Sequence, residues 1–265
     1  MSTESSRRIT TSLPQGITNL ADDDLLADMA LPDPSRYFQQ FEDFDKISSL
    51  DNIIFTQSPG IGGGAQIPDI STTSYTPGGQ LSVFTGVDIG DTASAILTPK
   101  NVSVLPFVTS GGNSKMGGRI RWQCGTTVDS VIAIGWAQDI PNGDPDQITD
   151  GYFIYKGDQT EQITFRIMSF GVMIYESAFM NTEDSLSNVN YETTFVNENN
   201  VFTMATQRST RQRPTQYWQD TTEIKFPAFP LLGPIAPFVA MKGTAAGTMT
   251  IFVDYMLSVG ERWYR

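Results

Sequence analysis

Two apolar stretches close together in the chain, residues 118–124 and 131–137, constrain the fold more than any other feature. In the first, Ile120 and Trp122 alternate with polar and charged neighbours, the period of two of a strand with one dry and one wet face. The second, VIAIGWA, contains no polar residue and is typical of a central strand covered on both faces. With residues 125–130 as the turn, the pair is predicted to form a hairpin. Its two tryptophans, each able to bury about 200 Å², are predicted to nucleate the core.

The remainder of the chain from residue 37 shows the same strand character. Short alternating runs are separated by turns rich in Gly, Pro, Asn and Asp. Residues 80–85 and 195–205 are each predicted to be a strand, and residues 248–259, rich in β-branched and aromatic types, are long enough for a central one. Many short strands with such turns predict an all-β, antiparallel two-sheet sandwich over residues 37–265.

Residues 1–36 differ from this pattern. They are rich in aspartate, show little strand patterning and end in Leu31-Pro32-Asp33-Pro34. Residues 19–29 could form about two helical turns with one apolar stripe. We predict an extended N-terminal arm over residues 1–36, separate from the sandwich domain, that docks on a partner; the alternative is a solvated, partly disordered tail. The predicted anchors of the arm are Leu20, Leu25, Leu26 and Met29.

Composition excludes several classes of function. The chain has no histidine, which removes Ser-His-Asp and Cys-His catalysis and His-ligated zinc. Its net charge of −12 argues against a nucleic acid or an anionic membrane as a partner, and no stretch offers the roughly 18 uninterrupted apolar residues of a membrane span. Cys124 is the only cysteine, so no intrachain disulfide can form, which suits folding in a reducing cytoplasm.

An acidic loop follows the second apolar stretch and is a candidate cation site. Asp139, Asp144, Asp146 and Asp150 could direct several carboxylates at a hard cation such as calcium. The spacing does not match an EF-hand, and acidic turns of this kind are usually solvated, so no metal ligands are assigned.

Acids within predicted strands are the candidates for catalysis. Asp254 lies in an apolar run and Glu192 in a polar one. Sugar hydrolysis needs two carboxyl groups about 5–9 Å apart; a glycoside hydrolase built on this pair would be silenced by Asp254→Asn or Glu192→Gln. We expect instead that Asp254 pairs with an arginine or a backbone N–H group, and that the chain is not an enzyme.

A small basic patch, Arg208, Arg211 and Arg213, stands beside Tyr217 and Trp218. Such a patch could bind an anion, a sugar or a nucleic acid. On a net-acidic chain it is predicted to be a polar interface that meets an acidic neighbour.

Several stretches together resemble the concanavalin A-like (lectin/glucanase) jelly-roll proteins of tailed-phage virions. GGRIRWQ, VIAIGWAQ, the acidic loop and DGYFIYKGD are similar to consecutive strands of those proteins. Residues 77–86 look like their early turn and strand, and the segment from 231 to 262 looks like their ending. The resemblance covers roughly residues 38–265. This chain departs from the family's catalytic and legume-lectin members, because the glucanase acid array and a convincing calcium/manganese loop are missing.

The resemblance implies a jelly-roll fold and a structural role without a cofactor. Such a chain would be a capsid cement or decoration protein that stabilises a phage head by bridging capsid subunits, made in the host cytoplasm and placed on the capsid surface. Its partners would be the major capsid protein and further copies of itself, with a trimer favoured. The alternative is a carbohydrate- or receptor-binding module of a phage fibre.

Overall fold

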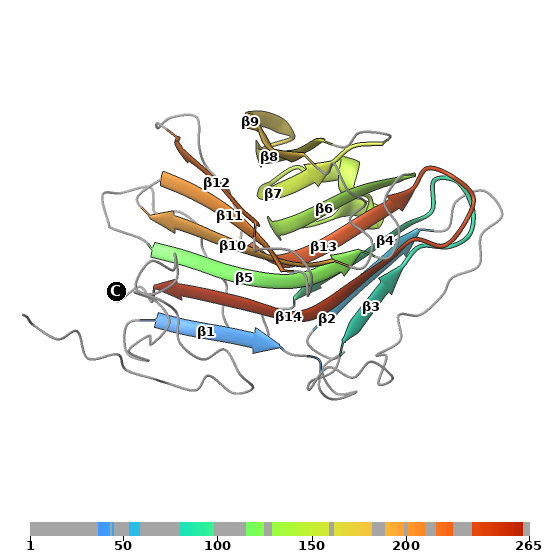
Figure 1. The fold of residues 1–265 in the computed structure, drawn as a ribbon, viewed down its shortest axis with the longest axis horizontal. Coiled ribbons are helices and arrows are strands. Elements are labelled where there is room, and N and C mark those ends of the chain that lie inside the picture. Colours follow the sequence, from blue (N-terminus) through green and yellow to red (C-terminus); the bar gives the residue numbers. More distant parts are fainter. Residues whose placement is uncertain are drawn as a thin grey trace, which may run out of the picture.

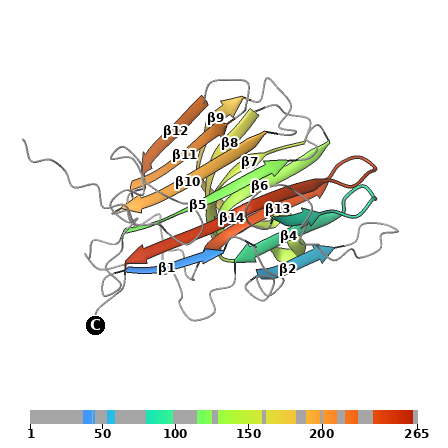
Figure 2. The same cartoon turned by 60° about the horizontal axis from the view of Figure 1, so that its bottom comes forward.

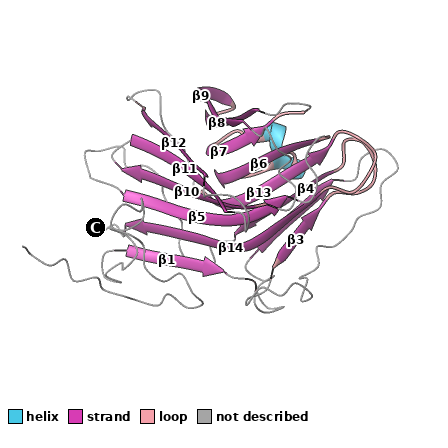
Figure 3. Cartoon of the chain, in the orientation of Figure 1, coloured by secondary structure: helices cyan, strands magenta, loops and turns pink. Residues whose placement is uncertain are grey.

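The computed structural model describes eleven segments of the chain, and they form two stacked β-sheets (Figure 1). These segments are residues 37–42, 44, 53–58, 80–97, 115–124, 129–158, 162–181, 189–198, 201–209, 216–224 and 235–261. Fourteen strands and two short 3-10 turns lie within them (Figure 3). The predicted N-terminal arm, with Leu20, Leu25, Leu26 and Met29, lies outside the described residues.

The strands follow one another as predicted for a chain of short β elements. They are β1 (Tyr37–Glu42), β2 (Ile53–Ser58), β3 (Leu81–Phe84), β4 (Thr92–Leu97), β5 (Lys115–Cys124), β6 (Ser130–Ala137), β7 (Gly151–Lys156), β8 (Gln162–Ser169), β9 (Val172–Asn181), β10 (Asn190–Glu198), β11 (Val201–Ser209), β12 (Gln216–Glu223), β13 (Ala236–Gly243) and β14 (Thr250–Glu261). The turns η3 (Pro141–Gly143) and η4 (Pro145–Gln147) lie between β6 and β7.

Each sheet has seven strands, and every pairing is antiparallel. Sheet A has the order β1-β14-β5-β10-β11-β12, with β3 also paired to β14. Sheet B has the order β2-β4-β13-β6-β7-β8-β9. Figures 1 and 2 show the two sheets stacked face to face, so the predicted all-β antiparallel sandwich is confirmed.

The predicted hairpin of the two apolar stretches is wrong, although both stretches are strands. β5 belongs to sheet A and β6 to sheet B, so they lie in different layers. Alternation fixes which face of a strand is dry, but it does not say whether two dry strands pair edge to edge or face each other. Similarly, the single strand expected over residues 195–205 is divided between β10 and β11, which pair as antiparallel neighbours.

The core lies between the sheets and contains both predicted tryptophans. Trp122 is 1% exposed and stacks on Tyr191 with ring centroids 4.7 Å apart. Trp136 is fully buried and packs on Phe195 at 5.4 Å. A Cβ added at Gly118 would lie 2.5 Å from the Trp136 ring, so only glycine lets this strand approach the indole.

β6 is buried along its whole length, as the absence of polar residues predicted. Its inward row, Ile132, Ile134 and Trp136, joins the main core. Its outward row, which includes Ala133 and Ala137, joins a second apolar cluster on the outer face of sheet B. Within the described residues, no helix is long and apolar enough to cross a membrane.

Candidate functional site

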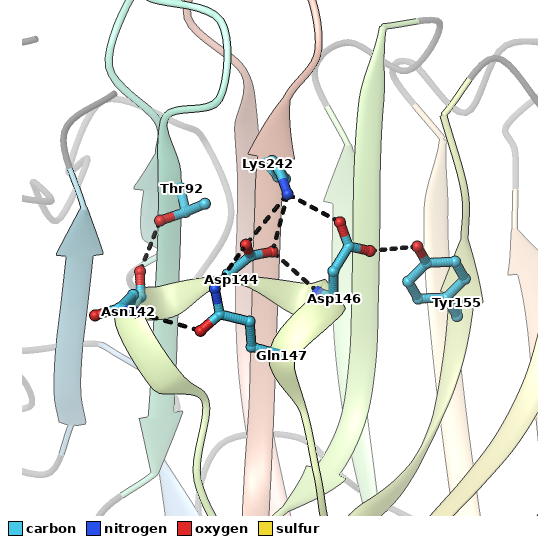
Figure 4. Close-up of polar contacts among 7 residues, drawn as sticks. All are labelled: Thr92, Asn142, Asp144, Asp146, Gln147, Tyr155 and Lys242. Atoms are coloured by element: carbon cyan, nitrogen blue, oxygen red, sulfur yellow. Dashed lines mark hydrogen bonds and ion pairs between the residues drawn. The ribbon is translucent and has the colours of Figure 1, made fainter. Parts of the chain in front are cut away.

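The acidic loop, residues 139–150, folds back over the outer face of sheet B. Ile140 and Ile148 at its two ends pack on Phe153 of β7 and Phe238 of β13. Small alanines at the outward positions of β6 and β13 belong to the same cluster and let the loop lie close to the strands. The loop therefore caps the middle of sheet B and brings its carboxylates over β13 and β7 (Figure 4).

Lys242 of β13 is the cation to which these carboxylates bind. Its Nζ donates to Asp144 Oδ2 at 3.1 Å and to Asp146 Oδ2 at 2.9 Å (Figure 4). Partial burial lowers the pKa of Lys242, but the hydrogen bonds and charges of the two aspartates outweigh it, so the pKa lies above its ordinary value. The ammonium group joins the loop to the sheet.

The contacts continue across the sheet to its edge strand. Tyr155 of β7 donates its hydroxyl proton to Asp146 Oδ1 at 2.5 Å. The guanidinium of Arg166 on β8 lies 3.6 Å from the centre of the Tyr155 ring, and its Nε lies 2.7 Å from Glu176 Oε1 on β9. Burial, followed by the hydrogen bond and charge of Asp146, raises the pKa of Tyr155 well above its ordinary value. We call this set the Lys242 network: Asp144, Asp146, Tyr155, Arg166, Glu176 and Lys242.

The first part of the loop is fixed to β4 and to itself. Thr92 of β4 donates to the Asn142 carbonyl at 2.7 Å. Asp144 caps η4 by accepting from the Asp146 N–H at 3.0 Å, and Gln147 Nε2 donates to Asp144 Oδ2 at 3.3 Å. Asn142 has a positive φ of 55°, which asparagine tolerates better than most residues. These contacts give the loop a defined conformation, so it is not a solvated acidic turn.

The four aspartates considered as cation ligands therefore make different contacts within the chain. Asp139 accepts from the N–H of Ile140 at 2.8 Å, and Asp150 accepts from the N–H of Phe170 at 2.9 Å. Only Asp144 and Asp146 converge, and they converge on Lys242. In the described segments, no three His, Cys, Asp or Glu residues are grouped so that they could hold a metal ion.

A second polar cluster lies on the outer face of sheet A. β5 turns Ile120 and Trp122 into the core, so the alternating Arg119 and Arg121 face outward. Arg119 Nε lies 3.4 Å from Glu192 Oε1 on β10, and Arg121 Nη1 lies 3.3 Å from Asp254 Oδ2 on β14. We call this set the strand-acid cluster: Arg119, Arg121, Glu192, Asp254 and Tyr255.

The two acids named as hydrolase candidates thus lie on one face, but both are paired. Tyr255 donates to Glu192 Oε2 at 2.7 Å, on the carboxylate that also meets Arg119. The expectation that Asp254 pairs with an arginine is confirmed. Burial raises the pKa of Asp254; Arg121 lowers it and Glu192 raises it, and the pKa remains above its ordinary value.

The predicted basic patch is only partly described. Arg208 lies on β11 in the inward row that also contains Phe202 and Met204, and it is half-buried. Trp218 packs against the core, whereas Tyr217 on β12 is 56% exposed. Arg211 and Arg213 lie outside the described residues, so the interface of Arg208, Arg211 and Arg213 stays a prediction.

Comparison with known proteins identifies the fold but no family. No protein-family model and no curated protein matches the sequence. Among solved structures, winged bean acidic lectin, complexed with methyl-α-D-galactose, superposes with a TM-score of 0.56 at 9% identity over 86% of this chain and 100% of the lectin. Peanut lectin superposes with a TM-score of 0.54 at 10% identity over 86% of this chain and 99% of that one.

A module from a phage protein has the same fold. The CBM2 module of the evolved Dit of Lactobacillus casei BL23 phage J-1 superposes with a TM-score of 0.50 at 13% identity, over 87% of this chain and 98% of the module. The fold is the concanavalin A-like jelly roll. At such identities the likeness extends to the fold alone.

Two features of the site escaped prediction. Lys242 is the only charged residue between Ile235 and Gly243, and a lone charge in an apolar run was a signal that it has a specific partner. The turn Phe170-Gly171 carries two positive φ values, 52° and 72°, and no local sequence pattern indicates that a phenylalanine takes such a conformation.

Proposed function

We propose that this chain is a non-catalytic structural protein of a phage virion, of the capsid cement type. Its sandwich would present rigid surfaces to the major capsid protein and to further copies of itself on the capsid surface. The resemblance of its strands to tailed-phage jelly-roll proteins supports this proposal, as does the likeness of its fold to a module of a phage Dit.

The observation that carries the proposal is the internal pairing of acids on both outer faces. Asp144 and Asp146 bind Lys242, Glu192 meets Arg119, and Asp254 meets Arg121. A general acid or nucleophile needs a carboxyl group directed at a substrate. These carboxylates are directed at cations of the same chain, an arrangement suited to a rigid body.

The mechanism is mechanical and depends on many copies acting together. Each contact can be weak, because neighbouring copies on a lattice raise the effective concentration for the next contact. An arm that becomes ordered on binding adds reach at a cost in ordering entropy. A homotrimer on the capsid surface, after synthesis in the host cytoplasm, fits this proposal, and neither nucleic acid nor membrane is needed as a partner.

Deletion of residues 1–36 tests the arm in this proposal. The shortened chain is expected to remain a folded sandwich by circular dichroism and to lose attachment to particles in sedimentation. Full-length protein is the control. Undiminished attachment of the shortened chain would contradict the role of the arm, and failure of the full-length chain to sediment with particles would contradict the virion function.

Carbohydrate binding is the second candidate function. Winged bean acidic lectin was solved with methyl-α-D-galactose, and the phage structure is a CBM2 module. On this chain, the strand-acid cluster offers partly exposed ionic groups, with 42% of the Arg121 side chain and 30% of the Glu192 side chain exposed, that could hydrogen-bond sugar hydroxyls. A glycan array with wild type and Arg121→Ala tests it: saturable binding that the variant loses favours this candidate.

A further inference from the structure

The turn between β8 and β9 carries three large, exposed apolar side chains. Phe170 is 54% exposed, Val172 59% and Met173 47%. We call these three residues the hairpin tip. Large apolar residues exposed singly are ordinary, but three of them around one turn, with Val172 and Met173 on opposite faces of the strand, make the end of the hairpin a candidate contact surface.

Phe170 also occupies a backbone conformation that disfavours it. Ser169 and Val172 are paired, so the turn consists of Phe170 and Gly171 alone, and both have positive φ. Two positive φ values characterise the type I′ hairpin turn, which prefers Asn-Gly. A bulky side chain in this region is an outlier. Strain of this kind gathers at functional sites, and here it places an aromatic ring in solvent where asparagine would fit better.

The tip is held in place from beneath. The N–H of Phe170 donates to Asp150 Oδ1 at 2.9 Å, and the N–H of Gly171 donates to the carbonyl of Thr149 at 3.0 Å. Both acceptors belong to the acidic loop, which is itself fixed by Lys242. A surface that is already ordered loses little conformational entropy on binding.

The charge around the tip selects the partner. Asp150 lies directly beneath the tip, Asp139 belongs to the same loop, and the whole chain carries a net charge of −12. An anionic lipid surface would be repelled by these acids. A protein pocket with an apolar floor and basic groups at its rim would complement both the tip and its surroundings.

We propose that the hairpin tip is an anchor by which the sandwich docks into an apolar, basic-rimmed pocket of a protein in the particle. The inference rests on the proposed virion function and adds a binding surface to it. The anchor lies on the rigid body of the protein and adds to the contact made by residues 1–36, so that the loss of either one weakens attachment. Phe170 enters the pocket, and Val172 and Met173 cover its border.

The test uses full-length protein and particles prepared without it, with binding measured by sedimentation. Phe170→Asn should raise the melting temperature, because asparagine relieves the strained turn, and should weaken binding to particles at least tenfold. Val172→Thr combined with Met173→Gln should weaken binding without unfolding the protein. The matched control is Val87→Thr with Ile89→Thr in the loop between β3 and β4, where Val87 is 51% and Ile89 64% exposed; it should bind as wild type does.

Other outcomes would contradict the proposal in part or as a whole. Unchanged binding by Phe170→Asn, or an equal loss in the control, would remove the tip as anchor while leaving the virion function intact. No binding by wild type would remove both. Wild-type binding to phosphatidylglycerol vesicles that Phe170→Asn abolishes would make the partner a membrane. If wild type is an oligomer and Phe170→Asn is a monomer, the partner of the hairpin tip is a second copy of this chain.

Discussion

The outer face of sheet B is covered by a loop of the chain, whereas the outer face of sheet A is formed by the side chains of its own strands. The middle of sheet B is covered by the loop of residues 139–150, with an apolar cluster below and the Lys242 network above. Sheet A presents acids and arginines directly from its own strands, and Arg121 keeps 42% of its side chain exposed. A face closed by its own loop contributes to stability, whereas a face made of paired strand side chains stays accessible to a partner. Three predictions test this contrast.

The largest loss of stability is expected from a substitution in the apolar cluster beneath the loop. Phe153→Ala removes a ring that is 2% exposed and packs on Phe238 with centroids 6.0 Å apart. The cavity and the lost contacts should lower the free energy of unfolding by about 3–5 kcal/mol, measured by urea denaturation. Tyr217→Ala, an exposed aromatic on the outer face of sheet A, is the matched control and should change stability by less than about 0.5 kcal/mol. Equal losses would remove the contrast between the faces.

An intermediate effect is expected at Lys242. Lys242→Met retains an aliphatic chain but removes the ammonium group from Asp144 and Asp146, and should cost about 1–3 kcal/mol; Lys242→Arg keeps the charge and should cost less. The folded-state pKa values of Lys242 and Tyr155 are both raised. The stability that these two groups contribute is therefore fully present below their unfolded-state pKa values of 10.5 and 10.0. It is lost as pH rises through their folded-state pKa values.

Denaturation above pH 10 measures this loss. Wild type should become steadily less stable as pH rises from 10, and Lys242→Met should show a smaller decline, because it lacks one of the groups whose folded pKa is raised. A variant as stable as wild type, with the same alkaline decline, would mean that the ammonium does not hold the loop.

The smallest effect is expected in the strand-acid cluster. Half-exposed ion pairs contribute about 1 kcal/mol or less, so Asp254→Asn should change stability by no more than that. The folded pKa of Asp254 is raised above 3.8, so its contribution is full below pH 3.8 and is lost as pH rises through the folded value. The stability of Asp254→Asn relative to wild type should therefore increase as pH rises above 3.8. A relative stability independent of pH would contradict the raised pKa.

Local patterns predicted much of the body of the protein. Alternation around Trp122, and the lack of polar residues around Trp136, correctly indicated a one-sided strand and a two-sided one. Both tryptophans are in the core because burying large apolar rings is favourable in any arrangement of these strands. Cys124, at the end of the alternating stretch, is also in the core and is 1% exposed.

Partners across the fold could not be predicted in the same way. Asp144 and Lys242 are separated by 98 positions, and nothing near either residue specifies the other. Asp254 could be expected to need a cation, because a charge in an apolar strand must be paired, but the identity of Arg121 follows only from the register of β5 and β14.

The sequence by itself determined that this chain is an all-β sandwich without histidine chemistry, since strand periodicity and composition are local properties. Only the tertiary structure decided that β5 and β6 lie in opposite sheets, that the acidic loop closes onto Lys242, and that Phe170 stands exposed on a strained turn. Side chains far apart in the chain become neighbours only through strand order and register, and these are set by the packing of the whole body.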